Sequence, residues 1–118
     1  MSPAPRTVDR VLRALSDPTR RRVVEQLASG PTSVGDLAAP FSMALPSFVQ
    51  HLRVLEDAGV VRSTKKGRVR TVRLVPRRLE VIDDWLRTQR SRWEARLDRH
   101  DQYLRSLPEQ ERKKETDA

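Results

Sequence analysis

Residues 33–74 decide the fold, and they read SVGDLAAPFSMALPSFVQHLRVLEDAGVVRSTKKGRVRTVRL. Apolar residues recur at helical spacing in two short segments of this stretch, and β-branched residues are frequent in two later ones. In order, the stretch holds a helical pattern, a break, a second helical pattern and two strand patterns, at residues 34–38, 40–43, 45–58, 60–64 and 69–74. The expected order is therefore helix, turn, helix, strand, tight turn and strand.

This order is the layout of a winged helix-turn-helix, in which one helix enters the major groove of duplex DNA and a β-hairpin, the wing, lies beside it. The second helix, ended by Gly59, is the expected recognition helix. Lys65-Lys66-Gly67-Arg68 is the expected turn of the wing. The core stripe of the recognition helix is expected to be Leu45, Phe48, Leu52 and Leu55. We predict a mostly α-helical chain with one small β-hairpin.

Two more helices are expected before this stretch. The first is a short one, indicated by apolar residues at Val8, Val11, Leu12 and Leu15. Asp17 before Pro18 suits the N-cap and first position of the second helix, which is expected to run to about Ser29. Gly30-Pro31 then ends it.

After Pro76, a long helical pattern runs from residue 78 to residue 107, with apolar positions close to a heptad repeat. A small winged module cannot cover such a stripe, so we expect it to pack against its own copy in a homodimer. The residues expected at this interface are Val8, Leu12, Leu79, Ile82, Leu86, Trp93, Leu97 and Leu104.

The expected organisation has four parts. They are a flexible arm at residues 1–6, the winged helix-turn-helix region at 7–76, the dimerisation helix at 77–107 and a charged, disordered tail at 108–118.

The charge distribution favours a polyanionic partner. The net charge is +8 and the isoelectric point is about 11.1. Residues 1–76 carry 13 basic and 6 acidic side chains, whereas residues 77–118 carry 11 and 10. Residues 60–76, around the wing, carry six basic residues and no acidic one. The excess positive charge therefore lies in the predicted DNA-binding region, and double-stranded DNA is the expected partner.

The exposed face of the recognition helix is expected to read bases. Gln50 can pair with adenine through its amide, and Val49 can contact a thymine methyl group. The residues expected to contact bases are Ser47, Val49, Gln50 and His51. Contacts to phosphates, which position the protein without reading sequence, are expected from Arg53, Lys65, Lys66, Arg68 and Arg70. The run Arg20-Arg21-Arg22 is weaker evidence, because consecutive residues point in different directions around a helix.

Three motifs resemble the arsenic-repressor (ArsR-type) family of winged-helix regulators. ALSDPTR at residues 14–20 resembles its second-helix signature, and HLRVLEDAGVV at 51–61 resembles its recognition helix and exit. Gly67-Arg68, followed by an alternating strand, resembles its wing. The resemblance implies a homodimeric, DNA-binding transcriptional repressor, often released from its operator by a metal or another signal.

The chain departs from the family pattern at two positions. Val49 and Ala44 stand where many members have serine. Val49 removes a polar group that could read a base, and Ala44 removes a good N-cap, leaving Ser42 or water to satisfy the first amides.

The composition disfavours several other classes. The chain has no cysteine, which excludes disulfides and thiolate metal sites. No apolar run approaches the length of a membrane span, and the N-terminus lacks a secretory signal, so we expect no membrane partner and a cytoplasmic location. The Asp and His residues of the last helix are a weak metal set, and they are Asp83, Asp84, Asp98, His100 and Asp101.

We therefore expect no metal, cofactor or enzymatic activity, and the inducing signal stays open. Two alternatives to a sequence-specific regulator remain open as well. One is a winged helix used for protein interaction, and the other is a nonspecific, nucleoid-type DNA binder.

Overall fold

The computed structural model describes residues 5–107, with side chains from Thr7 onward. The predicted tail at 108–118, and residues 1–4 of the predicted arm, lie outside the described residues. The first helix, α1 (Pro5–Ala14), includes the last two residues of the arm predicted at residues 1–6. A proline is favoured at the first helical position because its missing N–H would have no acceptor within the helix.

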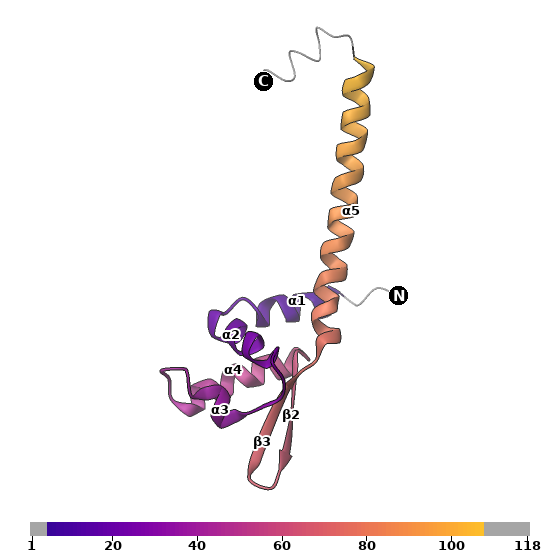
Figure 1. The fold of residues 1–118 in the computed structure, drawn as a ribbon. Coiled ribbons are helices and arrows are strands. Elements are labelled where there is room, and N and C mark those ends of the chain that lie inside the picture. The colour runs from indigo at the N-terminus through magenta and orange to yellow at the C-terminus, as the bar shows by residue number, and fades with distance from the viewer. Residues whose placement is uncertain (1–4, 108–118) are drawn as a thin grey trace. The chain divides into compact units, whose positions relative to one another are not determined.

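The fold is mostly helical with a small antiparallel sheet, as predicted (Figure 1). After α1 the elements are α2 (Pro18–Leu27), β1 (Thr32–Ser33), α3 (Val34–Ala38), α4 (Leu45–Asp57), β2 (Val61–Lys66), β3 (Val69–Leu74) and α5 (Pro76–Ser106). The helix-turn-helix pair is α3 and α4, and the β2–β3 hairpin is the wing.

Short polar side chains cap two of the helices, and the cap at Asp17 is the one that the sequence predicts. The Asp17 carboxylate caps α2 by accepting from the Arg20 N–H at 3.0 Å. The Ser33 hydroxyl caps α3 by accepting from the Asp36 N–H at 3.2 Å. Gly59, which follows α4, has φ +77°, and a Cβ there would lie 2.6 Å from Arg78 Nε. Only glycine fits this exit without strain.

A third strand, β1, was not predicted. The strand order is β1-β3-β2, with Thr32 paired to Val72 and Ser33 to Thr71. Two residues are too few to show the alternation by which a strand is recognised. The pairing depends on β3, far along the chain, so it is set by tertiary structure.

The wing turn is shorter than predicted. Lys65 and Lys66 belong to β2 and pair with Arg70 and Val69, so the turn itself is only Gly67-Arg68. Gly67 has φ +64°, and a glycine with positive φ at the first central position is typical of a type II′ hairpin turn. Because successive strand residues face opposite sides, Lys65 and Lys66 lie on different faces of the wing.

The core is apolar, and one predicted member is absent from it. The buried residues of α4 are Phe48, Leu52 and Leu55, as expected, but Leu45 is 55% exposed. Leu45 is the first residue of the helix. The apolar contact at this end of the core comes instead from Phe41, whose ring centroid lies 5.3 Å from that of Phe48.

The chain divides into two compact units between Asp83 and Asp84, within α5. The sequence places the boundary earlier, between residues 76 and 77. We call the part of the chain up to Asp83 the winged unit. The first turns of α5 belong to it because Leu79 and Ile82 pack against its core.

Candidate nucleic-acid interface

The exposed face of α4 presents a mixed set of side chains. Ser47, Gln50 and Arg53 are exposed, as are the apolar Val49 and Val54. These side chains point to solvent because the opposite side of α4 is buried in the core. The face has hydrogen-bonding groups and methyl groups side by side, which is what reading base edges in a major groove requires.

Backbone hydrogen bonds, and no side-chain cap, satisfy the first N–H groups of α4. Ala44 is the N-cap and makes no side-chain capping bond. The Ser47 and Phe48 N–H groups both donate to the Ala44 carbonyl, each at 3.1 Å, and Pro46 has no N–H to satisfy. The serine that the family pattern prefers at position 44 is therefore not needed to begin this helix.

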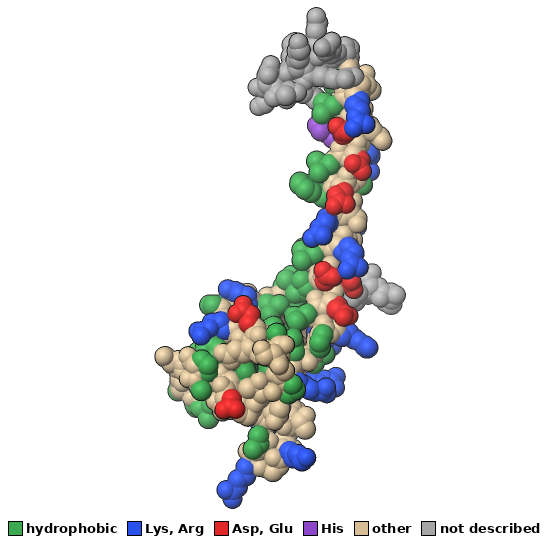
Figure 2. All heavy atoms as spheres, viewed as in Figure 1, with side chains coloured by type: hydrophobic (Ala, Val, Ile, Leu, Met, Phe, Trp, Pro, Cys, Tyr) green, Lys and Arg blue, Asp and Glu red, His purple; other side chains and the backbone are tan. Residues whose placement is uncertain are grey.

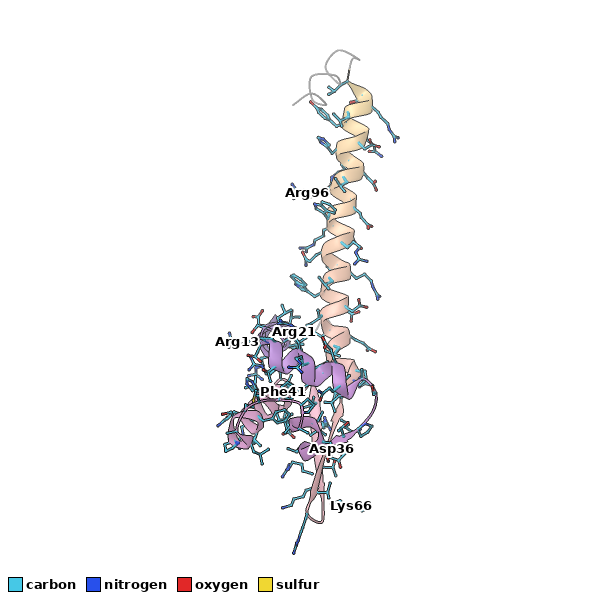
Figure 3. The ribbon with its side chains drawn as sticks, turned by 60° about the vertical axis from the view of Figure 1, so that its left-hand side comes forward. Arg13, Arg21, Asp36, Phe41, Lys66 and Arg96 are labelled. Carbon is cyan, nitrogen blue, oxygen red and sulfur yellow. The ribbon has the colours of Figure 1, made fainter. Side chains whose placement is uncertain are left out.

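The wing carries its positive charge on both faces and at its tip. Lys65 and Arg70 are directly opposite each other on the face that also holds the buried Val61 and Val72. Lys66 lies on the other face, near the tip of the hairpin and away from Arg13 and Arg21 (Figure 3). Like charges opposed across a ladder disfavour folding, so this arrangement is suited to a partner that brings negative charge.

A groove of about 370 Å³ separates α4 from the wing. It is lined on the helix side by Val49, Arg53 and Glu56 and on the wing side by residues that include Ser63 and Arg70. The structure thus brings two predicted phosphate-contacting arginines, Arg53 and Arg70, to one groove.

His51 faces α2 more than solvent. Its Nδ1 accepts from Arg20 Nη1 at 3.2 Å and lies 3.7 Å from Asp17 Oδ2. The His51 and Asp17 side chains are 24% and 29% exposed. His51 is thereby part of a link between α2 and the recognition helix, and its contact with a base stays a prediction.

Contacts within α2 and with α4 lower the pKa of Asp17. Partial burial pushes the pKa of Asp17 upward, but the hydrogen bond from the Arg20 N–H, the electrostatic influence of the nearby His51 and Arg20 side chains and the hydrogen bond from the Thr19 N–H together hold it below the ordinary value of 3.8. The ionised carboxylate is the form that caps α2.

The arginine run has structural partners. Arg20 donates to the carbonyls of Ala14 and Arg13, at 2.6 and 3.3 Å, and Arg21 donates to the Leu15 carbonyl at 2.8 Å. These carbonyls lie at the end of α1, where a helix leaves acceptors unpaired. The Arg22 guanidinium lies 4.6 Å from the centroid of the Phe41 ring. Sequence spacing did not reveal these roles, because the partners lie in other elements.

The residues predicted for the dimer interface fall into two groups. Those that belong to the winged unit are largely covered: Val8 is buried, Leu79 and Ile82 are half-buried, and Leu12 is 42% exposed. In the second unit, Leu86, Trp93 and Leu97 are 46%, 64% and 47% exposed, and Leu104 is half-buried.

The sequence also raises the questions of a metal site and a membrane span. Within residues 5–107, no three His, Asp or Glu side chains come together as a metal site would require. In the same range, no helix combines the length and the apolar character that a membrane span needs.

The known proteins that this chain resembles are helix-turn-helix transcriptional regulators. A helix-turn-helix domain family matches residues 15–64. The chain is 42% identical over 77 residues to the HTH-type transcriptional regulator Rv2034 of Mycobacterium tuberculosis, covering 65% of this chain and 72% of that protein. It is 38% identical over 60 residues to the transcriptional repressor SdpR of Bacillus subtilis, covering 51% and 67%. The crystal structure of an ArsR family transcriptional regulator matches with a TM-score of 0.76 and 44% identity, over 80% of this chain and 97% of that one.

The Asp17 cap gives a stability prediction. Asp17→Ala should lower the free energy of unfolding by about 1 kcal/mol near neutral pH, because α2 loses its N-cap. Asp17→Asn keeps a capping oxygen without the charge and should lose less. Since the folded-state pKa lies below 3.8, the carboxylate's contribution is present above that value and is lost as the pH falls through the folded-state pKa.

Urea unfolding of the wild type and Asp17→Asn, from about pH 6 to about pH 2, measures this. The difference between the two should shrink toward the acid end. A difference that stays constant over the range would contradict the assignment.

Proposed function

The chain belongs to the ArsR family of winged helix-turn-helix transcriptional regulators, and from that premise we propose that it represses transcription as a homodimer bound to an inverted repeat. Two recognition helices would enter successive major grooves, and the bound dimer would block a promoter. A cytoplasmic location is part of this proposal, because a repressor acts in the compartment that holds its DNA.

The observation that carries the proposal is the pairing of two surfaces in one compact unit. The exposed face of α4 offers base-reading groups, and the neighbouring wing offers concentrated positive charge. The first supplies discrimination and the second supplies attraction to phosphates, and a specific DNA-binding protein needs both.

The residue roles follow from these positions. We assign base contacts to Ser47, Val49 and Gln50, with His51 contributing through the edge of its ring that Arg20 does not occupy. We assign phosphate contacts to Arg53, Lys65, Lys66, Arg68 and Arg70.

The homodimer is supported by the second unit. Exposed apolar side chains recur along this part of α5, with charged side chains beside them (Figure 2). Leu86, Trp93 and Leu97 recur at steps of seven and four, a heptad-like seam suited to another helix. A second copy of the same helix would cover these side chains symmetrically.

A nonspecific, nucleoid-type binder is the runner-up. Val49, in place of a polar residue, narrows the hydrogen-bonding capacity of the recognition helix. Such a protein would keep the wing contacts and have no preference for one sequence.

Selection of bound duplexes from a random library, at about 0.15 M salt, tests the proposal directly. The expected result is an enriched inverted repeat, preferred over a scrambled duplex by about a thousandfold or more. Binding without enrichment would favour the nucleoid-type role. An absence of binding would contradict both and favour a protein partner.

Removing wing charge should weaken binding to all duplexes alike. For Lys65→Ala, Lys66→Ala and Arg68→Ala together, the slope of log K against log salt should flatten by about 0.9 for each phosphate that the protein no longer neutralises. The same reduction of charge at Arg87, Arg92 and Arg99 of α5 is the matched control. An unchanged slope in the wing variant would remove the wing from the interface.

The homodimer can be tested on the seam of α5. Leu97→Asp should produce monomers in sedimentation velocity and weaken operator binding, because a charge would have to be buried between two helices. Ala95→Asp is the control, since two residues advance roughly 200° around a helix. If Leu97→Asp remains dimeric, the seam is misassigned.

A further inference from the structure

A chain of hydrogen bonds joins the last turn of α4 to the wing. Glu56 Oε1 accepts from the Ser63 hydroxyl at 3.0 Å and from the Ser63 N–H at 3.4 Å. The Ser63 hydroxyl oxygen in turn accepts from Arg70 Nη1 at 2.9 Å. The three residues line the groove between the recognition helix and the wing. The acidic Glu56 is thus linked through Ser63 to Arg70, although the surrounding surface is suited to binding phosphates.

The edge position of β2 explains why the carboxylate is held there. β2 is an outer strand of the three-stranded sheet, and such a strand leaves N–H groups without a partner in the ladder. Glu56 accepts the Ser63 N–H from outside the sheet. Glu56 therefore holds both the backbone and the hydroxyl of Ser63.

We propose that Glu56 is a positioning residue that acts through Ser63 to hold Arg70 on the inner face of the wing, and that this restraint raises discrimination between operator and random DNA. The inference rests on the proposed function for its DNA readout. Arg70 is restrained within the groove, so it contacts a phosphate only where the duplex fits the paired geometry of helix and wing.

Restraining Arg70 affects specificity mainly through the affinity for random DNA. Specificity is a difference between two affinities, so lowering the affinity for random DNA raises it. Nonspecific binding is almost wholly phosphate attraction. An arginine that moves freely contributes to it on any sequence, whereas one bonded to Ser63 must first break that bond.

Asp57 provides a matched control. It is the next residue of α4 and carries the same charge, but it lines a different groove, together with Arg10 and Arg13 of α1. Glu56→Ala and Asp57→Ala therefore change net charge equally and differ in contact with the wing. Glu56→Gln removes the charge but keeps an oxygen that can accept both Ser63 bonds.

Affinity for a random duplex and for the selected operator, across a salt series, tests the proposal. Glu56→Ala should steepen the salt slope by about 0.9 and raise random-duplex affinity by about fivefold at roughly 0.15 M salt, the effect of one additional neutralised phosphate. Operator affinity should rise less, so the specificity ratio falls. Glu56→Gln and Asp57→Ala should each stay within about twofold of the wild type, the size of a weak surface charge effect.

An Arg70→Ala background separates the mechanism from a general charge effect. If Glu56 acts through Arg70, Glu56→Ala should have no further effect on the slope in that background. A gain that persists without Arg70, or an equal gain in Asp57→Ala, would overturn the proposal.

Amide hydrogen exchange at Ser63 tests the restraint without DNA. Glu56→Ala should accelerate this exchange several-fold, whereas Glu56→Gln and Asp57→Ala should leave it unchanged. Unaltered exchange in Glu56→Ala would overturn the positioning role. If the wild type bound no duplex, the proposed function would fail, and the exchange result would decide the positioning role by itself.

Discussion

The burial of one side of α4 is the constraint on which the rest of this structure depends. Phe48, Leu52 and Leu55 are inserted into the core of the winged unit, so rotation of the helix would expose them to water. Burying each such side chain is worth about 1.5–3 kcal/mol, which leaves α4 one orientation. The polar and apolar groups of its other face therefore point outward.

The helix is held in that orientation from two sides by polar contacts. On one side, Asp17 caps α2 while Arg20 donates both to the end of α1 and to His51. On the other side, Glu56 bonds to Ser63 of the wing. These contacts connect the recognition helix to its neighbours without adding polar groups to the core, since among the described residues no polar or charged side chain is buried.

The two compact units differ in charge, as the sequence predicts. The winged unit holds the excess of basic residues, whereas the later part of α5 mixes charges around exposed apolar side chains. Leu79 and Ile82 fit the periodicity of that apolar stripe but are half-covered by the winged unit. The stripe therefore serves two surfaces in succession, first the core of its own unit and then, in the proposed dimer, a second helix.

Local information in the sequence determined most of the elements. Helical periodicity, the cap at Asp17 and the glycine exit at Gly59 depend on residues close together in the chain, so they can be predicted without a structure. Tertiary structure alone decided the pairing of β1 with β3, the exposure of Leu45 and the engagement of His51 and Glu56 with other elements. The physical reason is that each of these depends on how separate helices and strands lie against one another, which is set only when the core is packed.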